Sequence, residues 1–230
     1  MKSLFASVAT RYDHMNRLMS LALDRRWRRA ALSSATLPPA GAVLDLACGT
    51  GDFSIELLRL HANASITCID ITPEMLEIAK GKLSFAKDVR FATGDAQDLS
   101  KLATGSFSLI ICAFGFRNFP DKAMVLAECR RLLAPGGELV VLELFRPVSR
   151  ILGWCVSLWL AAIAFIFAHP TLRQYAHLRR SIARTVRADE FVALAEANGF
   201  LLRKKTFLPP AATALTFQRR TSASAYQMLP

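Results

Sequence analysis

Short apolar runs alternate with longer amphipathic stretches through the middle of the chain, from residue 42 to residue 145. The apolar runs are nearly continuous and rich in valine, isoleucine and leucine, which is typical of strands buried on both faces. They predict strands over Ala42–Leu46, Ser65–Asp70, Val89–Thr93, Phe107–Phe114 and Glu138–Phe145. Helices are predicted between them, near Phe53–Leu60, Pro73–Leu83 and Lys122–Leu133, with a turn at Pro135–Gly137. This alternation indicates an α/β fold whose mostly parallel sheet carries helices on both faces.

The two ends of the chain follow different patterns. Residues before about 40 have the spacing of two amphipathic helices, which the pair Pro38 and Pro39 closes. After the fifth predicted strand the regularity fails, and a helix near Ala188–Asn198 and two strand-like runs follow only later. We expect an N-terminal helical lid (1–40) and a main domain (41–230) that includes an apolar insertion (148–187).

The first predicted strand runs into the sequence LDLACGTGDF, residues 44–53. Its small residues, among them Gly49 and Gly51, let the backbone turn sharply and approach a ligand closely, although a tight turn without a ligand is the alternative. Asp45 and Asp52 flank the loop, so a pyrophosphate would meet two carboxylates. S-adenosylmethionine instead brings an ammonium and a sulfonium, which carboxylates attract. The loop therefore indicates S-adenosylmethionine rather than a dinucleotide.

Acids also follow the next two predicted strands. Asp70 ends the second strand, where a carboxylate can accept hydrogen bonds from both ribose hydroxyls. The alternative role for Asp70 is to cap the helix that opens at Pro73. Asp95 follows the third strand, where it could accept from an adenine amino group. Three acids after three successive strands form a more specific pattern than any one of them.

Four segments resemble those of the ubiquinone/menaquinone biosynthesis C-methyltransferases, a branch of the class I S-adenosylmethionine-dependent enzymes. They are RYDHMNRLMSLALDRRWRR near the N-terminus, LDLACGTGD, AFGFRNFPD at 113–121, and LAPGGELVVLELFRP, which ends at Pro147. The resemblance implies a class I methyltransferase fold and methylation of a ring carbon on a polyprenylated benzoquinol or naphthoquinol. It also implies cofactor contacts by Thr50, Asp70, Asp95 and Ala96. Ala113 stands where relatives often have serine, so any hydroxyl contact is missing there.

Arg117 is the candidate for activating the acceptor. A permanent cation near a phenolic oxygen favours the phenolate, which pushes electron density to the attacking ring carbon. Pairing with Asp121 to hold the loop is the alternative. Tyr12 and Asn16 are expected in the lid over the pocket, with helix packing and capping as their alternative. Tyr175, where the family pattern resumes, is expected among the substrate contacts.

The charge of the chain is strongly basic, with 29 Lys+Arg against 18 Asp+Glu and a net charge of +11. The excess lies in three clusters: Arg25, Arg26, Arg28 and Arg29; Arg173, Arg179, Arg180, Arg184 and Arg187; and Arg203, Lys204 and Lys205. Such clusters attract anionic lipid or nucleic acid. They lack interleaved aromatic residues and any nucleic-acid-binding motif, so we expect an anionic membrane surface and no nucleic-acid partner.

The stretch Ile151–Ala168 has eighteen uncharged residues, which reaches the lower end of membrane-spanning length, ~17–25. A spanning helix would separate the last helix and strands from their sheet. An interfacial or lid helix is therefore predicted, with a span or an ordinary buried helix as alternatives.

The five cysteines show no CxxC pair, and the four histidines are dispersed, so neither disulfides nor a metal site are expected. We predict a cytoplasmic enzyme, peripherally associated with the membrane, that methylates a quinol. A methyltransferase for another apolar or lipid acceptor, or a non-catalytic cofactor-binding scaffold, are the alternatives. A homodimer or a quinone-synthesis complex is left open.

Overall fold

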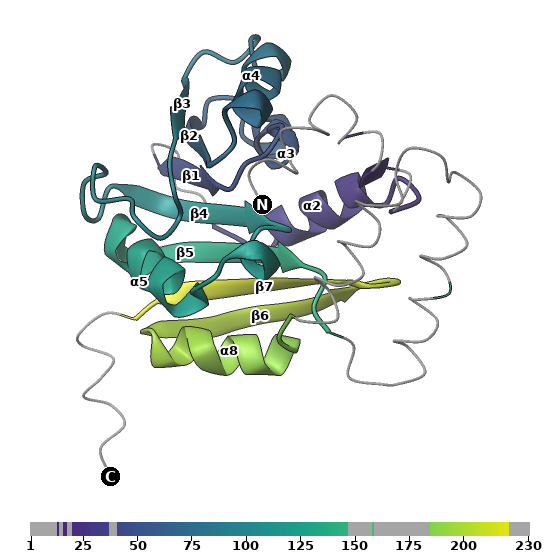
Figure 1. Cartoon of the computed structure of the whole chain (residues 1–230), viewed down its shortest axis with the longest axis vertical. Helices are drawn as coiled ribbons and strands as arrows, with labels where there is room; N and C mark the ends of the chain where they lie inside the picture. Colours follow the sequence, from purple (N-terminus) through teal and green to yellow (C-terminus); the bar gives the residue numbers. More distant parts are fainter. Residues whose placement is uncertain are drawn as a thin grey trace.

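The computed structural model describes residues 13, 16–17, 20–36, 41–146, 158 and 185–220. Within them, seven strands form one sheet in the order β3-β2-β1-β4-β5-β7-β6 (Figure 1). The strands are β1 (Ala42–Leu46), β2 (Ser65–Asp70), β3 (Val89–Thr93), β4 (Phe107–Ala113), β5 (Leu133–Glu143), β6 (Phe200–Leu208) and β7 (Ala212–Arg219). Strands β1 to β5 run parallel, and β7 pairs antiparallel with both β5 and β6. The predicted mostly parallel sheet is confirmed.

Helices cover the sheet on both faces, because successive strand residues point to opposite sides. The helices are α2 (Asp24–Leu32), α3 (Asp52–Leu60), α4 (Pro73–Lys82), the short 3₁₀ helix η1 (Phe116–Asn118), α5 (Lys122–Leu132) and α8 (Ala188–Ala197). Val43 of β1 packs in one buried cluster with α2, α3 and α4. The next residue, Leu44, packs in a second cluster with α5 and α8. Figure 1 shows α2 and α8 on opposite sides of the sheet.

The predicted strands are confirmed, but three of the predicted boundaries are wrong. The turn expected at Pro135–Gly137 lies inside β5, because Leu133 already pairs with Phe107 before the register shifts. Gly136 has a φ of 77°, which lets the strand accommodate the irregularity. Strand β4 ends before Phe114, whose φ is 59°, and β5 ends at Glu143 rather than two residues later.

Helix α2 confirms the second of the two helices predicted before residue 40. Trp27 is buried in the cluster beneath it, and its indole N–H donates to the Pro209 carbonyl at 2.9 Å. The predicted lid residue Tyr12, the contact Tyr175 and the stretch Ile151–Ala168, except Leu158, lie outside the described residues. None of the helices within the described ranges is long and apolar enough to cross a membrane.

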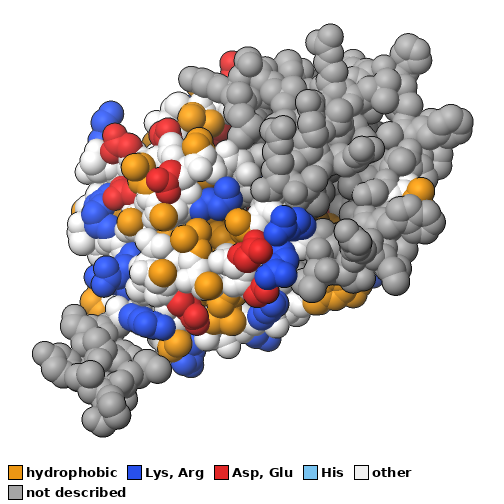
Figure 2. All heavy atoms as spheres, turned by 60° about the horizontal axis from the view of Figure 1, so that its bottom comes forward, with side chains coloured by type: hydrophobic (Ala, Val, Ile, Leu, Met, Phe, Trp, Pro, Cys, Tyr) orange, Lys and Arg blue, Asp and Glu red, His pale blue; other side chains and the backbone are white. Residues whose placement is uncertain are grey.

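The first basic cluster was expected on the surface, and for Arg28 this is wrong. Arg28 is only 5% exposed, because Asp24 lies one turn earlier on the buried face of α2 and pairs with it at 2.6 Å. Arg29 pairs with Glu56 of α3, and only Arg25 and Arg26 are exposed with no ion pair to another described residue. Elsewhere, lysine and arginine side chains lie among acidic and apolar ones (Figure 2).

Candidate functional site

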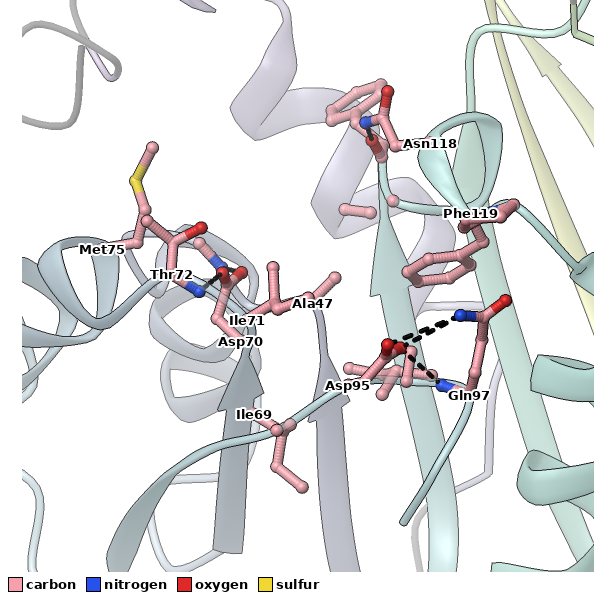
Figure 3. A pocket seen from close by; sticks show the side chains of 18 residues that line it. Ala47, Ile69, Asp70, Ile71, Thr72, Met75, Asp95, Gln97, Asn118 and Phe119 are labelled. Carbon is pink, nitrogen blue, oxygen red and sulfur yellow. Dashed lines mark hydrogen bonds between the residues drawn. The ribbon is translucent and has the colours of Figure 1, made fainter. Parts of the chain in front are cut away.

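Loops at the carboxyl ends of the parallel strands surround a cavity of about 230 Å³ (Figure 3). This is the edge where open α/β sheets bind their ligands. Residues from the loops after β1, β2, β3 and β4 line it: Leu46, Ala47, Gly49, Ile69, Asp70, Ile71, Thr72, Met75, Gly94, Asp95, Ala96, Gln97, Ala113, Phe114, Gly115, Asn118, Phe119 and Pro120. The structure thus brings together five of the expected cofactor-binding residues: Gly49, Asp70, Asp95, Ala96 and Ala113.

The loop after β1 turns sharply, as its sequence predicts. Ala47 and Gly49 both have positive φ, 54° and 55°, and both line the cavity. Gly51, also expected in the cofactor loop, lines neither this cavity nor the smaller one beside it and has a packing role. A Cβ on Gly51 would lie 2.9 Å from the Leu83 side chain, so this glycine lets α3 begin close to α4.

Asp70 is held at the end of β2 by two backbone donors. Its carboxylate accepts from the Gly49 N–H at 2.9 Å and from the Thr72 N–H at 2.8 Å (Figure 3). Burial raises the pKa of Asp70, and these hydrogen bonds oppose the rise. The alternative role as helix cap is wrong, because Thr72 occupies that position before α4. Asp70 therefore joins the loops after β1 and β2 and faces the cavity.

Asp95 lies on the opposite side of the cavity and is exposed. The Gln97 N–H donates to its carboxylate at 2.9 Å, while the Gln97 side-chain oxygen accepts from the Asp121 N–H at 3.1 Å. Gln97 thereby ties the loop after β3 to the loop before α5. Ala96 is buried beside them, which places the Asp95 carboxylate at the rim of an apolar wall.

A second, smaller cavity adjoins the first. Arg28 of α2, Asp45 at the end of β1 and the loop after β1 line it, and Ala47, Gly49, Ala113 and Phe114 line both cavities. One Asp45 oxygen, Oδ2, accepts from the Ser54 hydroxyl at 2.6 Å and from the Ser54 N–H at 3.2 Å. The other oxygen, Oδ1, has no partner among the described residues. Burial raises the pKa of Asp45 to about 7, although Ser54 and Arg28 oppose the rise.

Thr50 lies in the loop after β1, and Asp52 begins α3. Asp13 binds Thr50, and Lys82 of α4 binds both Thr50 and Asp52. The Thr50 hydroxyl donates to Asp13, and Thr50 also lines the smaller cavity. Lys82 of α4 pairs with Asp13 at 2.8 Å and also with Asp52. The Asp52 carboxylate is therefore paired with Lys82, whereas Asp45 and Asp70 form no ion pair with another described residue.

Arg117 lies in η1, just beyond β4, and its ion-pair partner was not predicted. Its guanidinium pairs with Glu143 at 2.5 Å, and its N–H donates to the same carboxylate at 3.0 Å. The expected alternative partner, Asp121, instead caps α5 by accepting from the Met124 N–H. Arg117 lines neither described cavity; it lies 5.7 Å from the centre of the Phe114 ring, which lines both.

Several site residues carry no strong local signal. Glu143 follows the apolar run at 139–142 and is itself buried, and an acid at the end of that run was the only hint in the sequence. Asn118 and Phe119 line the cavity and belong to the AFGFRNFPD segment. Asn16, expected in a lid, is described only as half-buried, with its carbonyl accepting from the Ser20 N–H.

The strand order, the single antiparallel strand and the acids after β1, β2 and β3 define a class I S-adenosylmethionine-dependent methyltransferase fold. An S-adenosylmethionine-dependent methyltransferase from Aquifex aeolicus has a TM-score of 0.68 at 15% identity, covering 93% of this chain and 97% of that one. A second, from Thermotoga maritima, has a TM-score of 0.67 at 17% identity, covering 96% and 100%. These solved structures show the fold.

Residues 1–212 match the model of the ubiE/COQ5 methyltransferase family, and the chain belongs to this family. The demethylmenaquinone methyltransferase of Deinococcus radiodurans is 38% identical over 213 residues, covering 88% of this chain and 85% of its own. That of Thermotoga maritima is 36% identical over 202 residues, covering 86% of each. The expected enzyme class and cofactor are thereby confirmed: the chain is an S-adenosylmethionine-dependent methyltransferase.

The residues around the two cavities fit this cofactor. The Asp45 oxygen without a partner is buried and therefore calls for a hydrogen-bond donor, which the cofactor's ammonium would supply. Among the described residues that line the larger cavity, the charged side chains are the carboxylates of Asp70 and Asp95, which suit a ligand that carries hydrogen-bond donors and positive charge. The left-handed backbone at Ala47 and Gly49 keeps the wall of the cavity free of bulky side chains.

Proposed function

We propose that this chain transfers a methyl group from S-adenosylmethionine to a ring carbon of a polyprenylated benzoquinol or naphthoquinol. The observation that carries the proposal is the family match over residues 1–212, together with relatives whose names specify demethylmenaquinone. A Geobacter relative, 40% identical over 149 residues that cover 64% of this chain and 63% of its own, is named for both ubiquinone and menaquinone biosynthesis. Because the names of these relatives cover both ring types, the acceptor assay below distinguishes a benzoquinol from a naphthoquinol.

Within this proposal, the larger cavity holds the adenosine part of the cofactor. Asp70 accepts from the ribose hydroxyls, since each of its oxygens keeps a lone pair beyond the one used by a backbone N–H. Asp95 accepts from the adenine amino group at the rim. Ala96 and Ala113 supply apolar walls, and Gly49 lets the backbone come close.

The acceptor binds near the carboxyl ends of β4 and β5, where Arg117 and Glu143 lie. When bound, S-adenosylmethionine supplies a methyl group made electrophilic by the sulfonium. Arg117 stabilises negative charge on the phenolic oxygen, which increases electron density at the ring carbon. The proton of that carbon is released to water once the methyl group is attached, which restores the aromatic ring. Glu143 positions Arg117, because it holds both the guanidinium and the backbone N–H of that residue. Holding donor and acceptor in line contributes roughly 7–11 kcal/mol to barrier lowering.

The acceptor of this proposal carries an apolar tail, so the enzyme works at an anionic membrane surface. Support comes from the net charge of +11 and from β6, where Leu201 and Phe207 are exposed beside Arg203, Lys204 and Lys205. The lid (1–40) and the insertion (148–187) complete the acceptor pocket in this proposal. Contact held by charge weakens in salt, because the Debye length falls from ~10 Å at 0.1 M to ~3 Å at 1 M.

Sedimentation with vesicles tests the membrane contact. The chain should pellet with anionic phospholipid vesicles at low salt, be released at high salt, and ignore zwitterionic vesicles. Lys204→Glu with Lys205→Glu should weaken the contact, whereas Lys80→Glu, on the exposed side of α4, should have less effect. Equal binding to both kinds of vesicle would contradict an electrostatic contact.

The proposed reaction is tested by incubating the purified chain with methyl-labelled cofactor and separate acceptors. These are a polyprenyl naphthoquinol lacking the ring methyl group, the corresponding benzoquinol, and phosphatidylethanolamine. We expect label on a ring carbon of one quinol, located by fragmentation in mass spectrometry. Label only on the lipid amine would favour another lipid acceptor. Cofactor binding with no transfer to any acceptor would favour a scaffold.

A further inference from the structure

Phe114, just beyond β4, has a left-handed backbone that is rare for an aromatic residue. Its φ is 59°, in a region that residues with a Cβ seldom adopt. The Phe114 N–H donates to the Leu142 carbonyl at 2.7 Å, and the Asn118 side chain donates to the Phe114 carbonyl at 3.3 Å (Figure 3). Contacts from β5 and from η1 thus hold the strained conformation. Strain of this kind persists mostly at functional sites, where the surrounding structure enforces it.

The residue after Phe114 brings the loop beyond β4 against the loop beyond β1. A Cβ on Gly115 would lie 2.7 Å from the Cys112 sulfur and 3.1 Å from the Ala47 Cβ, so a glycine is needed for this close approach. Phe114 itself is half-buried and lines both cavities. It therefore lies where the two cavities meet.

Two buried arginines lie beside the Phe114 ring. The guanidinium of Arg117 is 5.7 Å from the ring centre, and that of Arg28 is 5.5 Å from it. Both distances allow a cation–π attraction, which is stronger where the cation is removed from water. The side chains of Arg117 and Arg28 are only 9% and 6% exposed. One ring therefore contacts a cation from η1 and a cation from α2.

Glu143 holds only part of the Arg117 side chain. It pairs with Nη1 at 2.5 Å, whereas Nε is buried and has no partner among the described residues. A guanidinium held at one nitrogen can still turn about that contact. An aromatic ring beside its planar group restricts this rotation. Phe114 thus supplies the second contact that defines how Arg117 is oriented.

We propose that Phe114 is a positioning residue, whose ring holds the Arg117 guanidinium in the orientation that stabilises the phenolate of the acceptor. This inference rests on the proposed function. Phe114 acts through Arg117 and needs no contact of its own with the phenolic oxygen. The feature that matters is the aromatic ring rather than the apolar volume of the side chain.

Packing alone accounts for fewer features of Phe114. Its side chain packs against the buried cluster that includes α2, α3 and α4, and a leucine or methionine could do the same. Packing requires neither a left-handed backbone nor two arginines at the ring. It also leaves the orientation of the Arg117 guanidinium to Glu143 alone.

The pH dependence of methyl transfer tests this role. Single-turnover rates are measured at saturating cofactor with the quinol that the wild-type chain methylates. Because the phenolate is the reactive form, the rate should rise with pH to a plateau, and its midpoint reports the pKa of the bound phenol. Phe114→Leu should move this midpoint up by about 0.5 to 1 pH unit and lower the rate below the midpoint about 3- to 10-fold. Phe114→Tyr keeps the ring and should stay close to the wild type in both.

Three further variants separate orientation from packing. Phe116→Leu is the matched control, since Phe116 is a buried aromatic residue of η1 whose ring contacts other phenylalanines in the described part of the chain. It should lower stability without moving the pH midpoint. Phe114→Met also lacks a ring and replaces Phe114→Leu if that variant folds poorly. Combined with Arg117→Ala, Phe114→Leu should cause no further loss of rate, because the residue that it positions is absent.

An unchanged midpoint and rate in folded Phe114→Leu or Phe114→Met would overturn the assignment. Equal losses in Phe114→Leu and Phe114→Tyr, or losses that add to those of Arg117→Ala, would do the same. Failure of the wild-type chain to methylate any quinol would instead contradict the proposed function.

Discussion

The proposed adenosine side, around Asp70 and Asp95, and the proposed acceptor side, around Arg117, are built in different ways. On the adenosine side, Asp70 and Asp95 follow their own strands and accept backbone hydrogen bonds from residues two positions later, Thr72 and Gln97. On the acceptor side, the charge of Arg117 is matched by Glu143, 26 residues further along the chain. On the adenosine side each acid is therefore held by the turn that follows it, and Asp70 also by Gly49. The acceptor side depends on a long-range ion pair.

This difference has an energetic consequence. The Arg117 and Glu143 side chains are 9% and 1% exposed, so removing one leaves the other as an uncompensated buried charge. Asp95 is exposed, so replacing its hydrogen-bond partners should change the free energy of unfolding little. We expect changes on the acceptor side to affect both stability and turnover, and changes on the adenosine side to affect mainly cofactor affinity.

The largest effect should come from Glu143→Gln. Because Arg117 would lose its counter-charge in a buried position, the free energy of unfolding should fall by about 3 kcal/mol, measured by urea denaturation. Glu77→Gln is the matched control, since its partner Lys80 and Glu77 itself are both exposed. Surface pairs contribute about 0–1 kcal/mol, so equal effects of the two variants would contradict the contrast.

Arg117→Ala should reduce turnover by about 10²-fold or more, because the charge that stabilises the phenolate is lost. The variant also leaves Glu143 buried without its partner, so loss of stability must be separated from loss of catalysis. Arg117→Ala with Glu143→Gln provides that control. It should recover stability without recovering turnover. Turnover at the wild-type rate in either folded variant would show that Arg117 is only structural.

Asp70→Ala should weaken cofactor affinity by roughly 1.5–3 kcal/mol, since charge-assisted hydrogen bonds to the ribose are lost. Calorimetry with S-adenosylhomocysteine gives the value without turnover. Asp88→Ala, an exposed acid just before β3, should leave the affinity unchanged. Unaltered affinity in folded Asp70→Ala would rule out the proposed ribose contact.

The smallest expected effect is a change of ligand affinity with pH. It arises from Asp45, whose pKa is raised from 3.8 to about 7 by burial. Arg28, Ser54 and Asp70 also act on this carboxyl. Because the ligand's ammonium favours the ionised form, affinity for S-adenosylhomocysteine should rise by up to about tenfold between pH 6 and 8. Asp45→Asn should flatten this rise.

The same carboxyl affects the stability of the ligand-free chain in the opposite sense. A raised pKa favours the protonated form in the folded state, so this contribution is complete below pH 3.8 and is lost as the pH rises through about 7. The free energy of unfolding should therefore fall less steeply over that range in Asp45→Asn. An identical pH profile in the two proteins would contradict the raised pKa.

The sequence predicted the sheet well, because buried parallel strands are continuous apolar runs with acids at their carboxyl ends. Three of the predicted strands, β1, β2 and β3, have the predicted bounds, and Asp70 and Asp95 face the cavity as expected. These features depend on residues close together in the chain, which is why local patterns are sufficient to predict them.

The acceptor side could not be predicted in the same way. Nothing in the local sequence distinguishes Glu143 as the partner of Arg117, or Arg28 as a buried arginine within a run of four surface-like ones. The hydrogen bond from the Thr50 hydroxyl to Asp13, 37 residues away, was not predicted either. Pairing of this kind is determined by how the helices pack on the sheet rather than by spacing along the chain.

The division of labour between the two sides is tested most directly by the rate of methyl transfer as a function of cofactor concentration. For Asp70→Ala, we predict a curve shifted to higher concentration by roughly 10- to 100-fold that still reaches nearly the wild-type maximum. For Arg117→Ala, we predict an unchanged midpoint and a maximum about 10²-fold lower. A lowered maximum for Asp70→Ala together with a shifted midpoint for Arg117→Ala would contradict the division.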